Sequence, residues 1–415
     1  MKKSLFAVAA VTAFAGAAQA QSSVTVYGII DAGYVGTNTK LNSNSSAYMN
    51  RGGTQTTANG FTGKGAEQTS RLGFKGNEDL GGGTSAFFTY EVEMYPEDQD
   101  NSGNANKGLL NRQSFVGLKK NGLGQAAVGL QYTPIFNLGA VTDPGKNNNI
   151  VGNVTYSAGT LAKDNAGQDY NAAYTNRTAN TLSFKTDSFS GFTASGIYTL
   201  ANSNTTVLSS SSGGNTNASG WGLGADFTWH KLYIGAAVQQ LKQLTYTSNL
   251  TTPSGTTVNN PWVNAQPSSG VNSSTGVGTL TQNGLNVQDN QYLIGATYDF
   301  GILTAYGQYV SRTASATQNA NYYMKRQSEQ IGVRSYITPT IEGWASAGLG
   351  RYTALGATTP TANFNAWQLG SNYYLSKRTN LYAIYGQQVQ STASYGTTTV
   401  SSSASGYALG LRHTF

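Results

Sequence analysis

Apolar and polar residues alternate one by one along short segments of this chain, from residue 22 to the last residue. In residues 83–95, for example, Glu91 and Glu93 share one face of an extended segment, while Tyr90 and Val92 share the other. Because a period of two requires extended backbone, the chain is predicted to be all-β. A wall with carboxylates on one face and aromatic side chains on the other suits a boundary between water and lipid.

Sixteen such segments follow one another: 22–36, 68–78, 83–95, 109–119, 124–132, 176–186, 191–200, 220–229, 231–246, 288–299, 302–312, 326–337, 341–352, 363–375, 378–390 and 404–415. Connections after even-numbered segments are short, such as 121–123 and 338–340, whereas most after odd-numbered segments are long, such as 37–67 and 247–287. Bacterial outer-membrane barrels combine an even strand number with short periplasmic turns and long extracellular loops. The pattern therefore predicts a 16-stranded antiparallel transmembrane β-barrel. A soluble sandwich or propeller, the alternative, would not sort its connections in this way.

Composition limits how such a chain can be held together. Only 10% of its residues are charged, and its mean hydropathy is −0.33. No stretch after residue 20 has 18 consecutive apolar residues, so no transmembrane helix is predicted. The absence of cysteine excludes disulfides, cysteine-ligated metals and thiol nucleophiles. A closed ring of backbone hydrogen bonds can stabilise the chain without them.

The N-terminus has the features of an export signal. Lys2 and Lys3 precede an apolar stretch, residues 5–15, that is too short to span a bilayer as a helix. Ala18-Gln19-Ala20 matches a cleavage site for such signals. We therefore expect residues 1–20 to be a cleaved signal peptide and residues 21–415 to form one barrel domain. An N-terminal core helix is the alternative.

Five stretches at both ends and in the middle of the chain form a signature: Ser22–Gly33 (SSVTVYGIIDAG), Ser70–Gly83 (SRLGFKGNEDLGGG), Arg112–Leu118 (RQSFVGL), Tyr374–Thr379 (YLSKRT) and Gly410–Phe415 (GLRHTF). Together they resemble the trimeric general porins of β-proteobacteria, the group with the Neisseria, Burkholderia and Comamonas porins. The resemblance implies a homotrimer in the bacterial outer membrane, in contact with lipid and lipopolysaccharide and inserted by the barrel assembly machinery. Phe415, which ends an alternating strand, is the expected assembly signal.

The resemblance also implies that a third long loop folds inward and narrows the pore. The connection 133–175 is long enough for this and contains the basic Lys146. Its acidic residues, Asp143, Asp164 and Asp169, are candidates to face a basic wall, and the sequence does not choose among them. A loop that is merely exposed on the extracellular side is the alternative.

Alternation places Arg71 and Lys75 on the face opposite the apolar residues of their segment, and hence towards the lumen. Arg112 alternates with Gln113 and Phe115, and Arg177 begins the sixth segment. In the family that the chain resembles, arginines at the positions of Arg71, Arg112 and Arg177 form a basic cluster at the pore constriction. The alternative role for each arginine is structural, with its charge satisfied by another lumen charge: Asp31, Glu91 or Glu93.

One position departs from the family pattern. Many relatives carry a basic residue in the fifth strand, where this chain has Leu130 followed by Gln131. Loss of Lys2 and Lys3 with the signal peptide lowers the net charge from +7 to +5. We therefore expect passive diffusion of small hydrophilic solutes and ions, with a mild anion preference that salt screens.

Other function classes fit the sequence less well. The only histidines, His230 and His413, lie at strand ends and do not suggest a catalytic triad, and no cofactor or metal motif is present, so neither an enzyme nor a metal site is expected. The positive charges are too sparse and unclustered to predict nucleic-acid binding. Two alternatives stay open. A substrate-specific channel with an aromatic track would show saturable block, and a plugged barrel that serves as an adhesin or scaffold would not conduct.

Overall fold

The computed structural model describes residues 23–43, 54–98, 109–156, 162–163, 169–170, 172–205, 214–247, 285–316, 323–355, 361–395 and 398–415. Within these ranges the chain forms nineteen strands and a single helix, α2. The predicted signal segment, 1–20, lies outside them. None of the helical structure in these ranges is long and apolar enough to cross a membrane.

The strands are β1 Ser23–Ser43, β2 Thr54–Thr62, β3 Arg71–Gly81, β4 Thr84–Glu93, β5 Leu110–Lys120, β6 Gly124–Tyr132, β7 Ala162–Lys163, β8 Asp169–Tyr170, β9 Thr175–Thr186, β10 Phe192–Thr205, β11 Gly214–Trp229, β12 Leu232–Thr247, β13 Leu285–Asp299, β14 Thr304–Ala316, β15 Tyr323–Tyr336, β16 Ile341–Leu355, β17 Thr361–Tyr374, β18 Thr379–Tyr395 and β19 Thr398–Thr414. The helix α2 is Pro134–Thr142. It lies between β6 and β7 in the chain, inside the connection predicted to fold inward.

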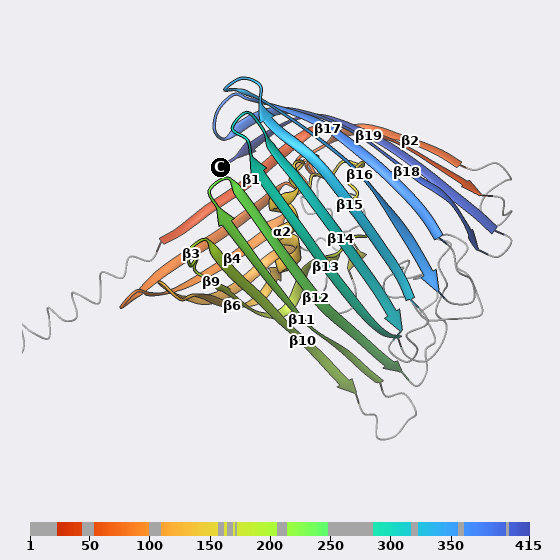
Figure 1. The fold of residues 1–415 in the computed structure, drawn as a ribbon. Coiled ribbons are helices and arrows are strands. Elements are labelled where there is room, and N and C mark those ends of the chain that lie inside the picture. The colour runs from red at the N-terminus through yellow and green to blue at the C-terminus, as the bar shows by residue number, and fades with distance from the viewer. Residues whose placement is uncertain are drawn as a thin grey trace, which may run out of the picture.

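The wall strands close into one antiparallel ring (Figure 1). β1 pairs with β19, so that Gly33 lies opposite Gly410 and the first and last strands join. β2 and β3 both pair with β1 and together take one place in the ring. The two-residue strands β7 and β8 pair with each other in the connection between β6 and β9. The described residues therefore form sixteen wall strands, which confirms the predicted barrel.

The strands run further than the alternation predicts, mainly towards the long loops. β18 continues to Tyr395 and β19 begins at Thr398, beyond the predicted limits of 390 and 404. β2 lies wholly within residues 37–67, and the prediction of a loop there was wrong. Most residues of β2 are polar on both faces, so the backbone ladder continues where the side-chain pattern no longer marks it.

The two faces of the wall differ as predicted. On the outer face, Leu223, Ile294 and Ile331 are 49%, 51% and 72% exposed. On the inner face, Gln291 and Gln368 have no exposed surface, because the inward connection covers them. An apolar outer face around a polar interior is the reverse of a soluble globular protein and suits contact with lipid.

Candidate functional site

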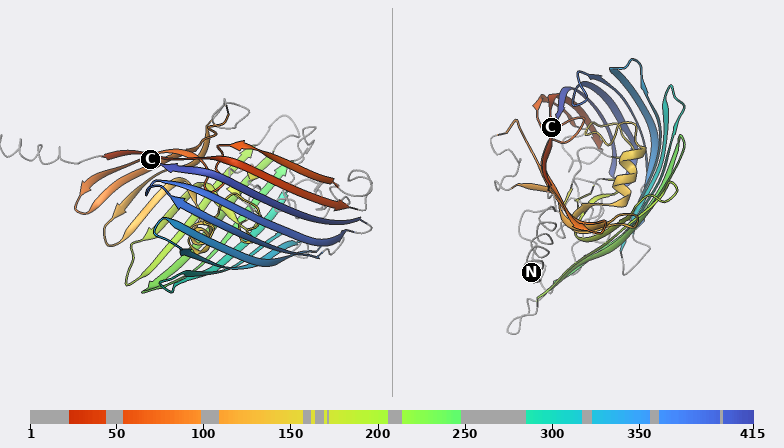
Figure 2. Two further views of the ribbon diagram at one scale, coloured as in Figure 1. Left: turned by 90° about the horizontal axis from the view of Figure 1, so that it is seen from above. Right: turned by 90° about the vertical axis from the view of Figure 1, so that its left-hand side faces the viewer.

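The connection between β6 and β9 folds into the barrel, and α2 lies inside the ring of strands (Figure 2). Thr133 caps the helix, because its side-chain oxygen accepts a hydrogen bond of 3.2 Å from the backbone N–H of Phe136. Leu138 packs against Leu293 of the wall. A Cβ atom on Gly235 would lie 2.6 Å from Leu138 Cδ1, so this glycine makes room for the helix. The predicted inward loop is confirmed.

Beyond α2 the loop is held by β15 and β17. Gln330 of β15 donates a hydrogen bond of 2.7 Å to Asp143, and Asn148 donates one of 2.9 Å to Gln368 of β17. Gln368 also donates to the carbonyl oxygen of Val151, at 3.0 Å. With α2 against β11–β14, the loop follows the inner wall from β11 to β17. We call this stretch the loop-covered wall. In the order of the ring, β13–β15 lie opposite β3–β5.

Asp143, one of the acidic candidates, fixes the turn after α2. Only 1% of it is exposed, and its carboxylate also accepts hydrogen bonds from the backbone N–H of Asn147 (2.7 Å) and the side-chain amide of Asn153 (3.0 Å). Burial raises the pKa of Asp143, and the hydrogen bonds from Asn147 and Gln330 oppose part of that rise. The carboxylate is enclosed between loop and wall, and its described partners do not include the predicted arginines.

The other two acidic candidates are placed less fully. Asp164 lies outside the described residues. Asp169 lies in β8, where its backbone pairs with that of Arg177. The loop backbone thus passes next to one of the predicted arginines.

On the wall opposite, two arginines share one carboxylate. Arg112 Nε lies 2.9 Å from Glu91 Oε1, and Arg71 Nη1 lies 3.9 Å from the same oxygen. Arg112 also lies 3.4 Å from Glu93 and donates a hydrogen bond of 2.8 Å to the hydroxyl of Tyr132. Both predicted arginines therefore face inward, and the carboxylates predicted as lumen charges, Glu91 and Glu93, are their partners.

Arg177 and Lys75 lie on strands near Arg71 and Arg112, and each of them contacts an aromatic ring. The guanidinium of Arg177 lies 5.6 Å from the ring centroid of Tyr132, and that ring stacks on Phe136 of α2 at 4.3 Å. Lys75 Nζ lies 5.3 Å from the ring centroid of Tyr27. The structure thus brings all four predicted cations onto neighbouring strands. We call this group the basic wall: Arg71, Lys75, Arg112 and Arg177.

Arg112 reaches the interior because β5 carries a bulge. The register between β4 and β5 shifts after Glu91, and Arg112 has no partner opposite it in the ladder. Strict alternation would group Arg112 with Val116, which is 61% exposed on the outer face. Phe115 contacts Phe87 with a centroid distance of 6.2 Å and lies on the inner face. The prediction that Phe115 and Arg112 lie on opposite faces was therefore wrong, although the inward direction of Arg112 was right.

The four cations of the basic wall differ in how much of their surface is exposed. Arg112 and Arg177 are only 6% and 5% exposed. The Arg71 side chain keeps 19% of its surface, and Lys75 is exposed. Arg71 and Lys75 are therefore the cations of this group that are most open to the interior.

Asp31, predicted as a lumen charge, faces inward but is enclosed. It has no exposed surface. Its carboxylate accepts hydrogen bonds from the backbone N–H groups of Glu67 (3.0 Å) and Gln68 (2.7 Å) and from the hydroxyl of Tyr382 (2.5 Å). The connection before β3 folds over this carboxylate. Asp31 is thus a structural charge and not an open one.

The sequence interpretation missed several charges on the loop-covered wall. Arg334 pairs with Glu342 at 2.6 Å, and Arg312 pairs with Asp289 at 2.5 Å. Arg326 is 2% exposed and donates a hydrogen bond of 2.6 Å to the loop carbonyl of Val154. The alternation in β15 could have found Arg334, because Ile331 and Val333 alternate with Gln330 and Arg334. It gives no such sign for Arg326, because residues 325–330 are all polar.

Comparisons with known proteins agree with this geometry. A family model described as Gram-negative porin matches residues 7–393. Outer membrane porin protein 32 of Delftia acidovorans is 37% identical over 200 residues, which are 47% of this chain and 48% of that protein. An outer membrane porin protein of Bordetella pertussis is 34% identical over 201 residues, 46% of each chain. The chain spans about half the length of the curated relatives it matches.

A solved structure matches over nearly the whole chain. The anion-selective porin from Comamonas acidovorans superposes with a TM-score of 0.60 at 23% sequence identity. The match covers 95% of this chain and 100% of that one. At this identity the likeness establishes the fold, and it agrees with the closed ring described above.

Proposed function

Because the chain belongs to the Gram-negative porin family, we propose that it forms a water-filled channel through the bacterial outer membrane. Small hydrophilic solutes and ions diffuse through it passively, with a mild preference for anions. The inward loop narrows the passage from the side of β11–β17, and the basic wall lines the opposite side.

The excess of cations on the basic wall carries this proposal. Its four cations face two carboxylates, Glu91 and Glu93, and the most exposed members are Arg71 and Lys75. Two unit charges 4 Å apart interact by about 1 kcal/mol in bulk water and by about 4 kcal/mol near a protein surface. Fixed charge of this strength biases permeation severalfold without excluding the other sign, and salt screens it.

Zero-current potentials of the refolded protein in a planar bilayer, under a salt gradient, test the proposal. We expect the sign that corresponds to anion flux, with a magnitude that shrinks as both salt concentrations rise. The opposite sign would refute the anion preference. Saturable block by one solute would favour a substrate-specific channel, and a complete lack of conductance would favour a plugged barrel.

We further propose that the channel is a homotrimer in contact with outer-membrane lipid and lipopolysaccharide. The exposed apolar residues of the outer face support contact with lipid and with neighbouring copies. Single-channel recording tests the assembly, because a trimer closes in three equal steps. The proposal assigns no catalytic step, metal or cofactor to the chain.

Phe415 is proposed as the signal that the barrel assembly machinery reads. It joins the seam between β19 and β1, since Phe415 and Gly28 exchange two backbone hydrogen bonds of 3.1 Å. Its ring covers Gly28, where a Cβ atom would lie 2.3 Å from Phe415 Cζ. A Phe415→Ala variant is expected to reach the outer membrane in smaller amounts, whereas the same variant refolds in detergent. Equal amounts in the membrane would refute the signal.

Removal of residues 1–20 is part of the same proposal. N-terminal sequencing of the protein isolated from outer membranes is expected to begin at Gln21. A mature protein that begins at Met1 would contradict the signal peptide.

A further inference from the structure

The side of α2 that is turned towards the passage is mainly apolar. Ile135 and Leu138 are buried against the wall. On the other side of the helix Val141 is 51% exposed, and Phe136 and Ala140 are half-buried. With 3.6 residues per turn these three residues share one side of the helix. We call them the apolar strip: Phe136, Ala140 and Val141.

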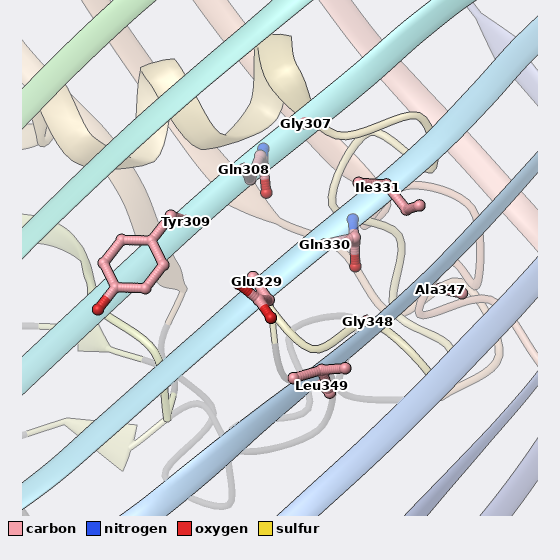
Figure 3. A pocket seen from close by; sticks show the side chains of 9 residues that line it. All are labelled: Gly307, Gln308, Tyr309, Glu329, Gln330, Ile331, Ala347, Gly348 and Leu349. Carbon is pink, nitrogen blue, oxygen red and sulfur yellow. The ribbon is translucent and has the colours of Figure 1, made fainter.

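Hydrogen bonds from the wall fix which side of the helix faces the passage. Gln308 of β14 donates to the carbonyl oxygen of Gly139 and to the hydroxyl of Thr142, both at 2.7 Å. Gln330 of β15 holds Asp143, the residue that follows the helix, at 2.7 Å. Figure 3 shows Gln308 and Gln330 on neighbouring strands, with α2 behind the wall. Because its back is tied to the wall in this way, the helix keeps the apolar strip towards the interior.

The passage side of α2 offers no counter-charge to the basic wall. Residues 134–142 contain no charged residue. Asp143 is the acidic residue of the inward loop whose side chain the structure describes, and it is enclosed with only 1% of its surface exposed. Among the described side chains of the loop, the basic wall therefore faces apolar groups and not carboxylates.

Tyr132 joins the basic wall to the apolar strip. Its hydroxyl accepts a hydrogen bond of 2.8 Å from Arg112. Its ring stacks on Phe136 with a centroid distance of 4.3 Å and an angle of 8° between the planes. Both rings are half-buried and thus keep part of their surface open to the interior. Cations and apolar surface are therefore neighbours in one site.

Arg71 has donors to spare at this site. Its Nε donates a hydrogen bond of 2.9 Å to the carbonyl oxygen of Thr69. Its Nη1 lies 3.9 Å from Glu91, which is longer than a hydrogen bond. Among the described residues none accepts a hydrogen bond from its Nη atoms, and 19% of the side chain is exposed. A guanidinium in this state can donate to an incoming carboxylate.

A site of this composition distinguishes between anions by their bodies. A small inorganic anion gains only from the cations, whereas an organic anion with an apolar body gains from the strip as well. An aromatic body also packs favourably against the edges and faces of other rings, such as Tyr132 and Phe136. Guanidinium groups stack on aromatic faces. Apolar and aromatic lining with a few polar groups is typical of small-molecule sites.

From these observations we propose that the passage binds small aromatic carboxylates. The carboxylate pairs with Arg71, and the ring lies against Tyr132 and the apolar strip. The inference deepens the proposed function and rests on its water-filled passage. We expect a dissociation constant on the order of 1 mM, because only one side of so small a ligand is covered. Binding this weak enriches a class of anions in the passage and leaves it open to other solutes.

Ligand-observed NMR titrations of the refolded full-length protein in detergent test the site without requiring conductance. The four ligands are benzoate, acetate, benzamide and cyclohexanecarboxylate, and detergent without protein is the blank. Arg71→Gln removes the cation and Val141→Asn interrupts the apolar strip. Asn137→Leu extends the strip, because Asn137 is exposed on the same side of the helix. Leu123→Asn, at a 72% exposed position in a short turn, is the matched control for loss of an apolar side chain.

We expect benzoate to bind about tenfold more tightly than acetate and benzamide, which lack the ring and the charge, respectively. It should bind about threefold more tightly than cyclohexanecarboxylate, which lacks the aromatic contacts. Val141→Asn should weaken benzoate about fivefold and acetate less than twofold, and Asn137→Leu should strengthen benzoate about threefold. Arg71→Gln should weaken both carboxylates about fivefold. Leu123→Asn should change neither.

Four results would overturn the inference. Benzoate that binds no more tightly than acetate would remove the apolar strip from the site, and equally tight binding of benzamide would remove the cation. Equally tight binding of cyclohexanecarboxylate would overturn the aromatic class. Equal weakening by Leu123→Asn would show diffuse binding. Heat-modifiable electrophoretic mobility checks folding, and if Val141→Asn does not fold, an unchanged benzoate affinity in Asn137→Leu overturns the strip.

Conductance of the same wild-type samples separates this inference from the proposed function. If the protein conducts with an anion preference but binds benzoate no more tightly than acetate, the aromatic site fails alone. If it does not conduct but binds benzoate with the expected pattern, the channel proposal fails and the binding site stands.

Discussion

The two halves of the inner wall use the same residue types for different purposes. On the loop-covered wall, Arg334 pairs with Glu342 and donates to the carbonyl oxygen of Pro144, so that loop and wall enclose its charge. On the basic wall, Arg71 meets Glu91 at 3.9 Å and keeps 19% of its side chain exposed. Alternation places both arginines on the inner face. Cover by the loop decides which of them is enclosed and which stays partly open to the interior of the barrel.

Breaking a pair on the loop-covered wall should have the largest effect on stability. Glu342→Gln leaves the buried Arg334 without its counter-charge, which costs about 3–5 kcal/mol in comparable buried pairs. Guanidinium unfolding followed by tryptophan fluorescence measures this loss, with Glu78→Gln at an exposed position of β3 as the control. Ion selectivity should not change. A loss below about 1 kcal/mol would mean that the loop does not enclose this pair.

The matched change on the basic wall should cost less stability and alter permeation. Glu91→Gln removes the carboxylate that Arg71 and Arg112 share, but Arg112 keeps Glu93 and Tyr132 as partners. We expect a loss of about 1–3 kcal/mol, typical of a buried group that loses one hydrogen-bond partner. The net positive charge of the wall rises, so the anion preference should increase. An unchanged zero-current potential would show that this charge is not felt in the passage.

Removing Arg71, a partly exposed cation, should change selectivity with little effect on stability. Arg71→Gln is expected to lower the chloride-to-potassium permeability ratio about two- to fivefold, since one charge near the ion path is worth about 1 kcal/mol in water. The stability change should stay below about 1 kcal/mol, because the contact of Arg71 with Glu91 is long, at 3.9 Å, and Glu91 keeps Arg112 as its partner. Lys377→Gln, in an exposed periplasmic turn, is the control for charge alone. If Lys377→Gln lowers the chloride-to-potassium permeability ratio equally, the anion preference does not come from the basic wall.

The smallest expected effect is a pH dependence on the loop side. Burial raises the native pKa of Asp143 above its unfolded value of about 3.9, so ionisation costs stability. The stability that the protonated Asp143 contributes is fully present below the unfolded pKa, and it is lost as pH rises through the native pKa. Urea unfolding at a series of pH values should therefore show that the free energy of unfolding of Asp143→Asn increases relative to that of wild type as pH rises. A difference in the free energy of unfolding that does not change with pH would contradict the raised pKa of Asp143. Asp79→Asn, at an exposed position, serves as the control.

Most of the wall could be predicted from the sequence because lipid and water impose one pattern on every strand. Phe88 and Tyr90 are exposed on the outer face and Glu91 faces inward, as the period of two requires. The pattern fades in β2, where neighbouring residues on opposite faces, such as Thr56 and Thr57, are both polar. That strand was therefore missed. Alternation therefore locates a strand only where its two faces meet different surroundings.

The candidate site was predictable in part. Arg71 follows simple alternation, whereas the bulge that turns Arg112 inward leaves no local mark in the sequence. The path of the loop depends on contacts such as that of Asn148 with Gln368, which are 220 positions apart. Asp31 was named as a lumen charge and a possible partner of an arginine, but the backbone N–H groups of a connection that folds back over it are its partners. Such long-range contacts are set by the closed ring and not by neighbouring residues.

The seam between the first and last strands also has a consequence for folding kinetics. The hydrogen bond from Tyr382 to Asp31 joins residues 351 positions apart, and Gly28 meets Phe415 at the end of the chain. Contacts this distant carry a large loop-closure entropy and form slowly. The ring can close only after the last strand is available, so a chain released without its final residues keeps two open edges that can pair with other chains.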